Sequence, residues 1–199
     1  DAQNTFNISY TPDGYKSNAT SVIGRNNDFV VANSYRDNST NSNGVVIMSC
    51  DFDGNINWSE DYNLGNLSIS FTNFGQLVPT QDGGFAFAIF KRISDYWYNN
   101  FYLMKFDSLG MLEWDKHCGL SQTVNQGLGL LENSLGDFLI TGLASAGNNL
   151  SNIYVVNIDN ETQDTIWTQH IEEENFQRSW TIAEDYDGAY ILGGVTGIS

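Results

Sequence analysis

Two groups of side chains in the sequence have types and spacings that could hold a metal ion. Asp51-Phe-Asp-Gly-Asn-Ile-Asn57 has side-chain oxygens at alternating positions, as in a calcium loop. Such a loop also needs a bidentate Glu at its twelfth position, where this chain has Tyr62, so a hairpin turn is the favoured interpretation. His117, His170 and Asp61 each follow a tryptophan by three residues and are zinc-binding types. Because they belong to different copies of a repeat, we expect them to lie too far apart to share an ion, and we predict no metal or cofactor.

Carboxylates that could act as catalytic acids recur once in each period of the sequence. They are Asp28, Asp82, Asp137 and Asp187. A catalytic acid needs one distinctive environment, so this repetition indicates a role in turns. The chain has no nucleophile elbow, P-loop or zinc-protease motif. We therefore predict that the protein is not an enzyme.

Aromatic residues offer a candidate binding site. Trp58, Trp114 and Trp167 recur regularly, which favours packing between repeats over a sugar-stacking platform. By contrast, the cluster Tyr96, Trp97, Tyr98 and Phe101 has no counterpart in the other repeats and falls in an expected loop. Aromatic rings beside Asn amides in a loop suit contact with carbohydrate or protein, so these four are the predicted ligand-binding residues.

Composition limits the classes of function. The chain has 199 residues and a net charge of −16, which argues against nucleic-acid binding and against an anionic membrane surface. Hydrophobic residues make up 41%, enough for a buried core, while 24 Asn and 19 Gly indicate many strands and turns. No apolar run is long enough for a transmembrane helix, so no membrane insertion is expected.

Sequons and cysteines bear on the compartment. N-x-S/T sequences begin at Asn7, Asn18, Asn38, Asn57, Asn66, Asn149 and Asn160. They fit either chance in an Asn-rich chain or a secreted glycoprotein, and with the acidic charge we predict an extracellular or cell-surface location. Cys50 and Cys118 fit either buried apolar positions or a disulfide.

An internal repeat predicts the fold. Residues 46–58 match 102–114 column by column, and 154–167 match with a one-residue insertion. A second repeated segment is Asp82-Gly-Gly-Phe85 with its equivalents in the other repeats. A third repeated segment, around Leu77, precedes the second one. Each period thus contains four short segments with strand-like patterns, joined by Asp- and Gly-containing turns typical of hairpins.

We predict an all-β fold, a β-propeller-like array of four-stranded antiparallel blades, in one domain over residues 1–199. Complete repeats are expected at about 19–72, 73–125 and 126–178. Residues 1–11 and 179–199 are left over as parts of an incomplete blade. Three interpretations stay open: a piece of a longer propeller, a ring closed on itself, or a polymer in which Asp1–Thr11 or Ala189–Ser199 is exchanged between molecules.

Three parts of the repeat resemble the propeller-like repeats of large secreted bacterial surface proteins of the type IX secretion class. They are Asp82-Gly-Gly-Phe85, Tyr102-Leu-Met-Lys-Phe-Asp-Ser-Leu-Gly110 and the recurring tryptophans. The resemblance covers nearly the whole chain. It implies a propeller-type fold and an adhesive or structural role at the cell surface.

The function predicted from the sequence is that of a non-enzymatic extracellular surface protein. It is expected to act by assembly, as a filament subunit joined by strand complementation, or by adhesion through self-association or contacts with cell-surface glycans. The alternative is a carbohydrate-binding propeller module that uses the loop Tyr96–Phe101.

Overall fold

The structure is a computed structural model that describes residues 15–37, 39–40, 42–65, 75–92, 99–119, 124–145, 151–172 and 176–197. These residues form fourteen β-strands and no helix. The chain divides into two compact units, Asp1–Asn73 and Phe74–Ser199, each of which is described by itself.

The first unit contains one four-stranded antiparallel sheet. Its strands are β1 (Tyr15–Gly24), β2 (Phe29–Asp37), β3 (Ser42–Cys50) and β4 (Ile56–Gly65), paired in chain order. Such sequential pairing needs only short hairpin connections, which the Gly- and Asp-containing turns of the sequence provide.

The second unit contains two further four-stranded sets and one pair. The sets are β5 (Gly75–Pro79), β6 (Phe85–Arg92), β7 (Asn99–Phe106) and β8 (Leu112–Cys118), then β9 (Val124–Glu132), β10 (Phe138–Ser145), β11 (Asn152–Ile158) and β12 (Thr165–Ile171). The pair is β13 (Phe176–Glu184) and β14 (Tyr190–Gly197). One parallel pairing, Asn99 with Val124, joins the two complete sets.

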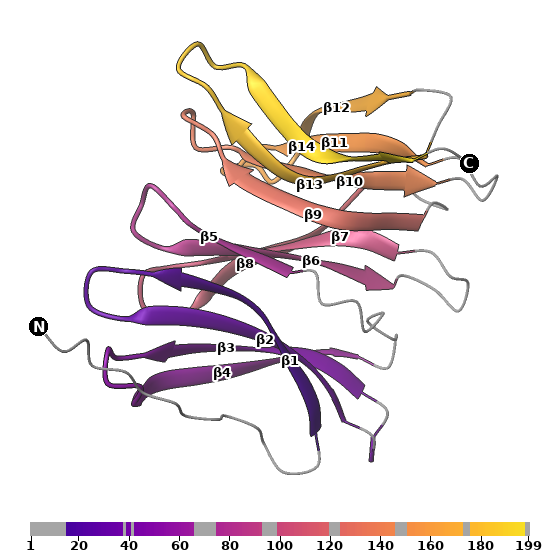
Figure 1. Cartoon of the computed structure of the whole chain (residues 1–199). Coiled ribbons are helices and arrows are strands. Elements are labelled where there is room, and N and C mark those ends of the chain that lie inside the picture. Colours follow the sequence, from indigo (N-terminus) through magenta and orange to yellow (C-terminus); the bar gives the residue numbers. More distant parts are fainter. Residues whose placement is uncertain are drawn as a thin grey trace, which may run out of the picture. The chain divides into compact units, whose positions relative to one another are not determined.

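The predicted fold class is confirmed: the protein is all-β, with three complete four-stranded blades and one incomplete blade (Figure 1). The division between the units at 73/74 falls beside the boundary at 72/73 predicted between the first two repeats. The predicted single domain stays a prediction beside these two units.

The turns repeat as closely as the strands. In each turn between the third and fourth strand of a blade, an opening aspartate accepts backbone N–H groups further along the turn; Asp107 Oδ1 accepts from Leu109 and Met111, both at 2.8 Å. Asp51 makes the equivalent bonds to Asp53 and Asn55. In the first two of these turns a glycine, Gly54 or Gly110, has a φ near +87°, a conformation that costs other residues free energy. The β11–β12 turn is one residue longer and has Gln163 at a φ of +58°.

The core lies between the blades of the second unit. One cluster joins the second and third blades, with Leu103 and Leu130 among its fully buried members and Trp114 packed edge-on to Phe138 at 5.7 Å. Another joins the third blade to β13–β14, with Leu139, Val155 and Ile182 buried together. Burying each such side chain contributes about 1.5–3 kcal/mol, so the blades are held by their faces. The third blade therefore packs against a neighbouring blade on each of its faces. Trp114 and Trp167 take part in these contacts, as the recurring tryptophans predicted.

Candidate functional site

In the part of the chain that the structure describes, the second strand of the incomplete blade has one edge without a partner strand, unlike the second strands of the complete blades. In each complete blade the second strand pairs with the first and the third, as β10 does with β9 and β11. Within the described residues, β14 pairs with β13 alone. Backbone N–H and C=O groups along such an edge can pair with an added strand.

A groove lies beside this edge. It has a volume of about 280 Å³ and is lined by Val155, Trp167, Gln169, Ile171, Tyr190 and Leu192. These residues come from the third and fourth strands of the third blade and from β14. Trp167 and Tyr190 lie across it with ring centroids 6.1 Å apart. Between the second and third blades, the equivalent place is filled by the packing of their third strands, where Phe101 of β7 stacks on Tyr154 of β11. The groove therefore corresponds to the place of a third strand in the incomplete blade.

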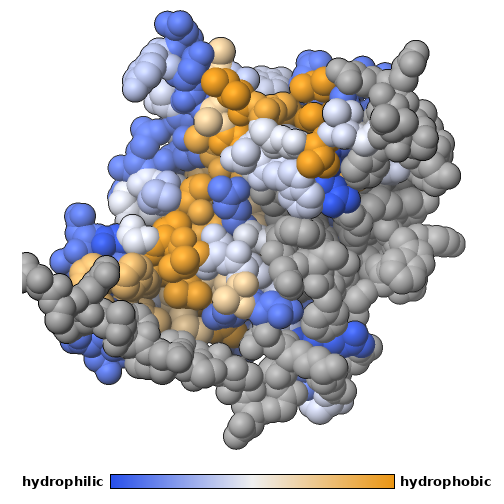
Figure 2. Space-filling model, viewed as in Figure 1, coloured by the Kyte–Doolittle hydropathy of each residue, from blue (hydrophilic) through white to orange (hydrophobic). Residues whose placement is uncertain are grey.

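One face of β14 exposes large apolar side chains. Counted from the turn, Ile191 and Val195 occupy the positions that Leu139 and Leu143 occupy in β10. Those two leucines are buried, whereas Ile191 and Val195 are 61% and 49% exposed. Hydrophobic surface is visible in Figure 2 near the top of the view, where Figure 1 places β13 and β14. This face has the composition of a blade-to-blade contact without a described partner.

A carboxylate clamp links the blades of the second unit at their turns. Glu132, the last residue of β9, accepts a hydrogen bond from the Gln81 N–H in the β5–β6 turn at 2.7 Å. Glu184, the last residue of β13, accepts from the Ser134 N–H in the β9–β10 turn at 2.7 Å, and from its hydroxyl at 3.0 Å. The same geometry is thus made twice, each time by the first strand of the following blade.

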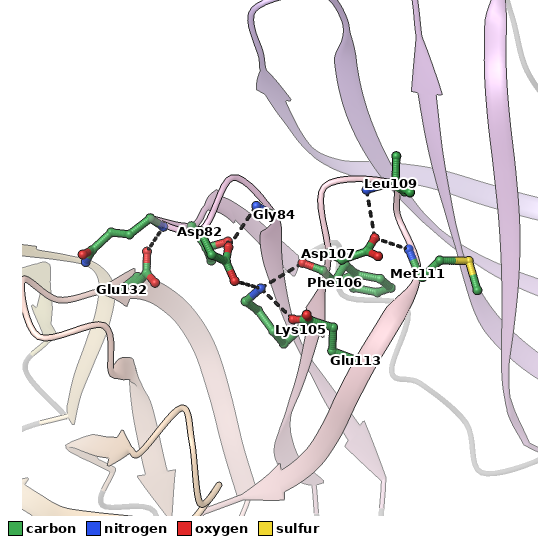
Figure 3. A network of polar contacts seen from close by, with 11 residues as sticks. Asp82, Gly84, Lys105, Phe106, Asp107, Leu109, Met111, Glu113 and Glu132 are labelled. Atoms are coloured by element: carbon green, nitrogen blue, oxygen red, sulfur yellow. Dashed lines mark hydrogen bonds and ion pairs between the residues drawn. The ribbon is translucent and has the colours of Figure 1, made fainter.

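A buried lysine forms a second polar network in this unit. The Lys105 side chain is 1% exposed, and its ammonium donates to Asp82 at 2.7 Å, to Glu113 at 2.9 Å and to the Phe106 carbonyl at 3.0 Å (Figure 3). Burial disfavours the charged form of Lys105, but the two carboxylates raise its pKa above the usual value. Burial likewise opposes ionisation of Asp82, yet hydrogen bonds from Lys105, Thr80 and Gly84 lower its pKa to about 2. All three donors of the ammonium have acceptors, so the network is structural.

The aromatic cluster predicted to bind a ligand is only partly visible. Tyr96, Trp97 and Tyr98 lie outside the described residues, and their role stays a prediction. Phe101 is a correction: it belongs to β7, its side chain is fully buried, and its ring stacks on Tyr154 with centroids 6.2 Å apart. A ring so placed stabilises the core and has no surface for a ligand.

The candidate metal ligands are used in other contacts. His117 packs on Tyr102 and His170 on Tyr154, each with ring centroids 4.8 Å apart, while Asp61 accepts from the Tyr35 hydroxyl at 2.6 Å. Among the described residues, no three His, Cys, Asp or Glu side chains converge where they could hold a metal ion. Asp51 accepts hydrogen bonds within its own turn, which confirms the hairpin interpretation.

Both cysteines are buried, and neither forms a disulfide in this structure. Cys50 lies in the first unit and Cys118 in the second. Burial raises the pKa of the Cys118 thiol to about 12, so the reactive thiolate is scarce at neutral pH. The structure therefore has buried apolar cysteines in place of the possible disulfide.

The predicted glycosylation sites lie at several kinds of position. Asn57 is exposed on β4, although its Nδ2 donates to the Ser49 hydroxyl at 3.0 Å, and Asn18 and Asn160 are partly exposed. Asn7, Asn38, Asn66 and Asn149 lie outside the described residues. Whether any of the seven carries a glycan stays a prediction.

Sequence reasoning missed the exposed apolar residues of β14, Ile191 and Val195, and also the clamp glutamates between the blades. Ile191 is apolar like its buried equivalents, so the sequence alone does not show that its side chain is exposed. Glu132 and Glu184 did carry a signal, because both end the first strand of a repeat just before its turn.

Comparisons with known proteins do not identify a family. No protein-family model matches the chain, and no curated protein matches it. A hypothetical protein from Leishmania major is a structural match over 94% of this chain and 82% of that one, with 8% identity and a TM-score of 0.35. Among the described residues, no helix is long and apolar enough to cross a membrane.

Proposed function

We propose that the protein is a non-enzymatic extracellular surface protein that works by assembly, in which the incomplete blade of one copy accepts a strand from another. The observation that carries this proposal is that β14 pairs with one strand among the described residues, whereas the equivalent second strands β2, β6 and β10 each pair with two. Strand addition at such an edge supplies main-chain hydrogen bonds, while pockets for alternate side chains supply specificity.

The proposed donor is the segment Asp1–Thr11. It contains Phe6, Ile8 and Tyr10, which alternate with polar residues. In a strand these three side chains lie on one face. That face matches the apolar groove lined by Val155, Trp167 and Leu192, which an added strand beside β14 would cover. The charge of −16 and the sequons support an extracellular place of action.

Deletion of Asp1–Thr11 tests this proposal. The intact chain should increase in mass with concentration in sedimentation velocity, and the deletion variant should stay monomeric with an unchanged β-sheet circular dichroism spectrum. Unchanged assembly of the deletion variant would rule out this segment as the donor.

A peptide experiment keeps the proposal testable if the deletion variant folds poorly. A fluorescent peptide of residues 1–14 should bind the intact chain saturably in a polarisation assay. A control peptide with Phe6, Ile8 and Tyr10 replaced by serine should bind at least about tenfold more weakly, because apolar burial is lost. Equal binding of both peptides would contradict recognition by the groove.

A further inference from the structure

The faces of the blades suggest how two copies meet beyond the donated strand. In each blade, the residue two positions before the end of the first strand is apolar: Val22, Leu77, Leu130 and Ile182. Leu77, Leu130 and Ile182 are buried, and Val22 is 61% exposed. Val22 is thus the exposed member of a set whose other members lie in covered positions.

The contact that buries this position is known within the second unit. Ile182 of β13 packs with Leu139 of β10, a residue on the facing side of the preceding blade. Ile191 of β14 is the equivalent of Leu139, and it is also 61% exposed. Among the described residues, Ile191 and Val22 are therefore the exposed equivalents of the buried pair Leu139 and Ile182.

We infer that the exposed β14 face of Ile191 and Val195 binds the β1 face of Val22 in a second copy, so that copies stack head to tail. This inference rests on the proposed function, because the donated segment directly precedes β1 and would bring the β1 face of its own copy to β14. The contact continues the blade-to-blade packing already present between β10 and β13. Such a heterologous contact adds copies without a limit unless it closes into a ring.

The carboxylate clamp is absent from this proposed contact. Gly24 ends β1 at the position where Glu132 and Glu184 end β9 and β13. The matching donor in the β13–β14 turn is the N–H of Tyr186, a residue whose side chain is fully exposed. A contact between two copies would thus bury the apolar pair without the glutamate, which makes it weaker than the contacts inside the chain.

Cross-linking between two single-cysteine variants tests the inference. A Val22→Cys copy mixed with an Ile191→Cys copy should form a disulfide-linked dimer on mild oxidation, which neither variant should form alone. Wild-type protein is the control, since Cys50 and Cys118 are buried. If no mixed dimer forms while sedimentation still shows self-association, the inference is wrong and the proposed function stands. If the chain does not self-associate at all, the proposed function itself fails.

A variant with both cysteines in one chain tests whether the chain closes into a ring. If Val22→Cys and Ile191→Cys in one chain link only within that chain, the β14 face is covered by the same molecule and the inference is overturned. A ladder of covalent oligomers is the expected result.

Two substitutions measure the strength of the contact. Ile191→Asp should weaken self-association at least about tenfold, whereas Leu109→Asp, at an exposed leucine in the β7–β8 turn, should leave it unchanged. Gly24→Glu should strengthen it about tenfold by adding the clamp, and Gly24→Gln less. A Cβ at Gly24 would meet only the Phe29 ring at 3.8 Å, so the substitution fits. Equal effects of Ile191→Asp and Leu109→Asp would refute the proposed face.

Discussion

At the scale of single residues, the second unit depends on a charge inside an apolar strand. Lys105 lies between Met104 and Phe106 on β7, and its ammonium is held by Asp82 and Glu113. A buried ammonium is stable only when its donors are satisfied. Asp82 lies in the β5–β6 turn and Glu113 near the start of β8, so the network fixes the two hairpins to each other (Figure 3).

Replacing Lys105 tests this network. Lys105→Met keeps the apolar stem but removes the donors, and we expect the free energy of unfolding at pH 7 to fall by about 1–2 kcal/mol, because both carboxylates can regain water. Urea unfolding measures the change. The matched control is Lys91→Met on β6, which removes a lysine that lies over the Tyr102 ring and makes no contact in this network. An equal loss in both variants would contradict a specific role for Lys105.

The same network predicts a dependence on pH. The pKa of Asp82 is lowered from 3.8 to about 2 in the folded protein, so its ionised form stabilises the fold above pH 3.8. This stabilisation is lost as the pH falls from about 4 to 2, and Lys105→Met should reduce that part of the acid sensitivity.

At the scale of elements, the turns determine where each strand begins. An aspartate or asparagine opens most of them and accepts backbone N–H groups, as Asn133 accepts from Leu135 at 3.0 Å and from Asp137 at 2.9 Å. Gly136 then has a φ of +90°. The hairpin therefore needs both a short side-chain acceptor and a residue that accepts a left-handed backbone.

Substitution of Gly136 measures the free-energy cost of a left-handed backbone conformation apart from any change in side-chain packing. No atom lies within 4 Å of an added Cβ there, so Gly136→Ala should cost only the backbone term, about 1 kcal/mol of unfolding free energy. Gly136→Asn is the control and should cost less, because Asn adopts this conformation more readily. Thermal unfolding of both variants provides the measurement, and equal stability of Gly136→Ala and wild type would contradict the argument.

These local signals explain how far the sequence predicts the structure. The Asp- and Gly-containing turns and the recurring columns predict strand order, because hairpin chemistry is local. The end of the aromatic loop could not be predicted in the same way, since residues on both faces of β7 are buried and no polar alternation shows that Phe101 is already in the strand. The exposure of Val22 and Ile191 could not be predicted from the sequence either, because it depends on whether a neighbouring blade covers them.

At the scale of the whole molecule, the proposed assembly rests on the number of strands in each blade. Three blades have four strands each, and the described residues of the fourth have two. Propellers usually contain about four blades or more. Among the described residues, β14 has one unpaired edge, and one of its faces is exposed at Ile191 and Val195. With a charge of −16 on each copy, apolar and backbone contacts must overcome repulsion between copies.

Electron microscopy of the intact protein, purified without cutting or refolding, shows whether copies of the chain assemble. We expect filaments whose repeat corresponds to one chain, and their loss in the variant without Asp1–Thr11. Discrete particles with the mass of a single chain at every concentration would contradict assembly as the function of this protein.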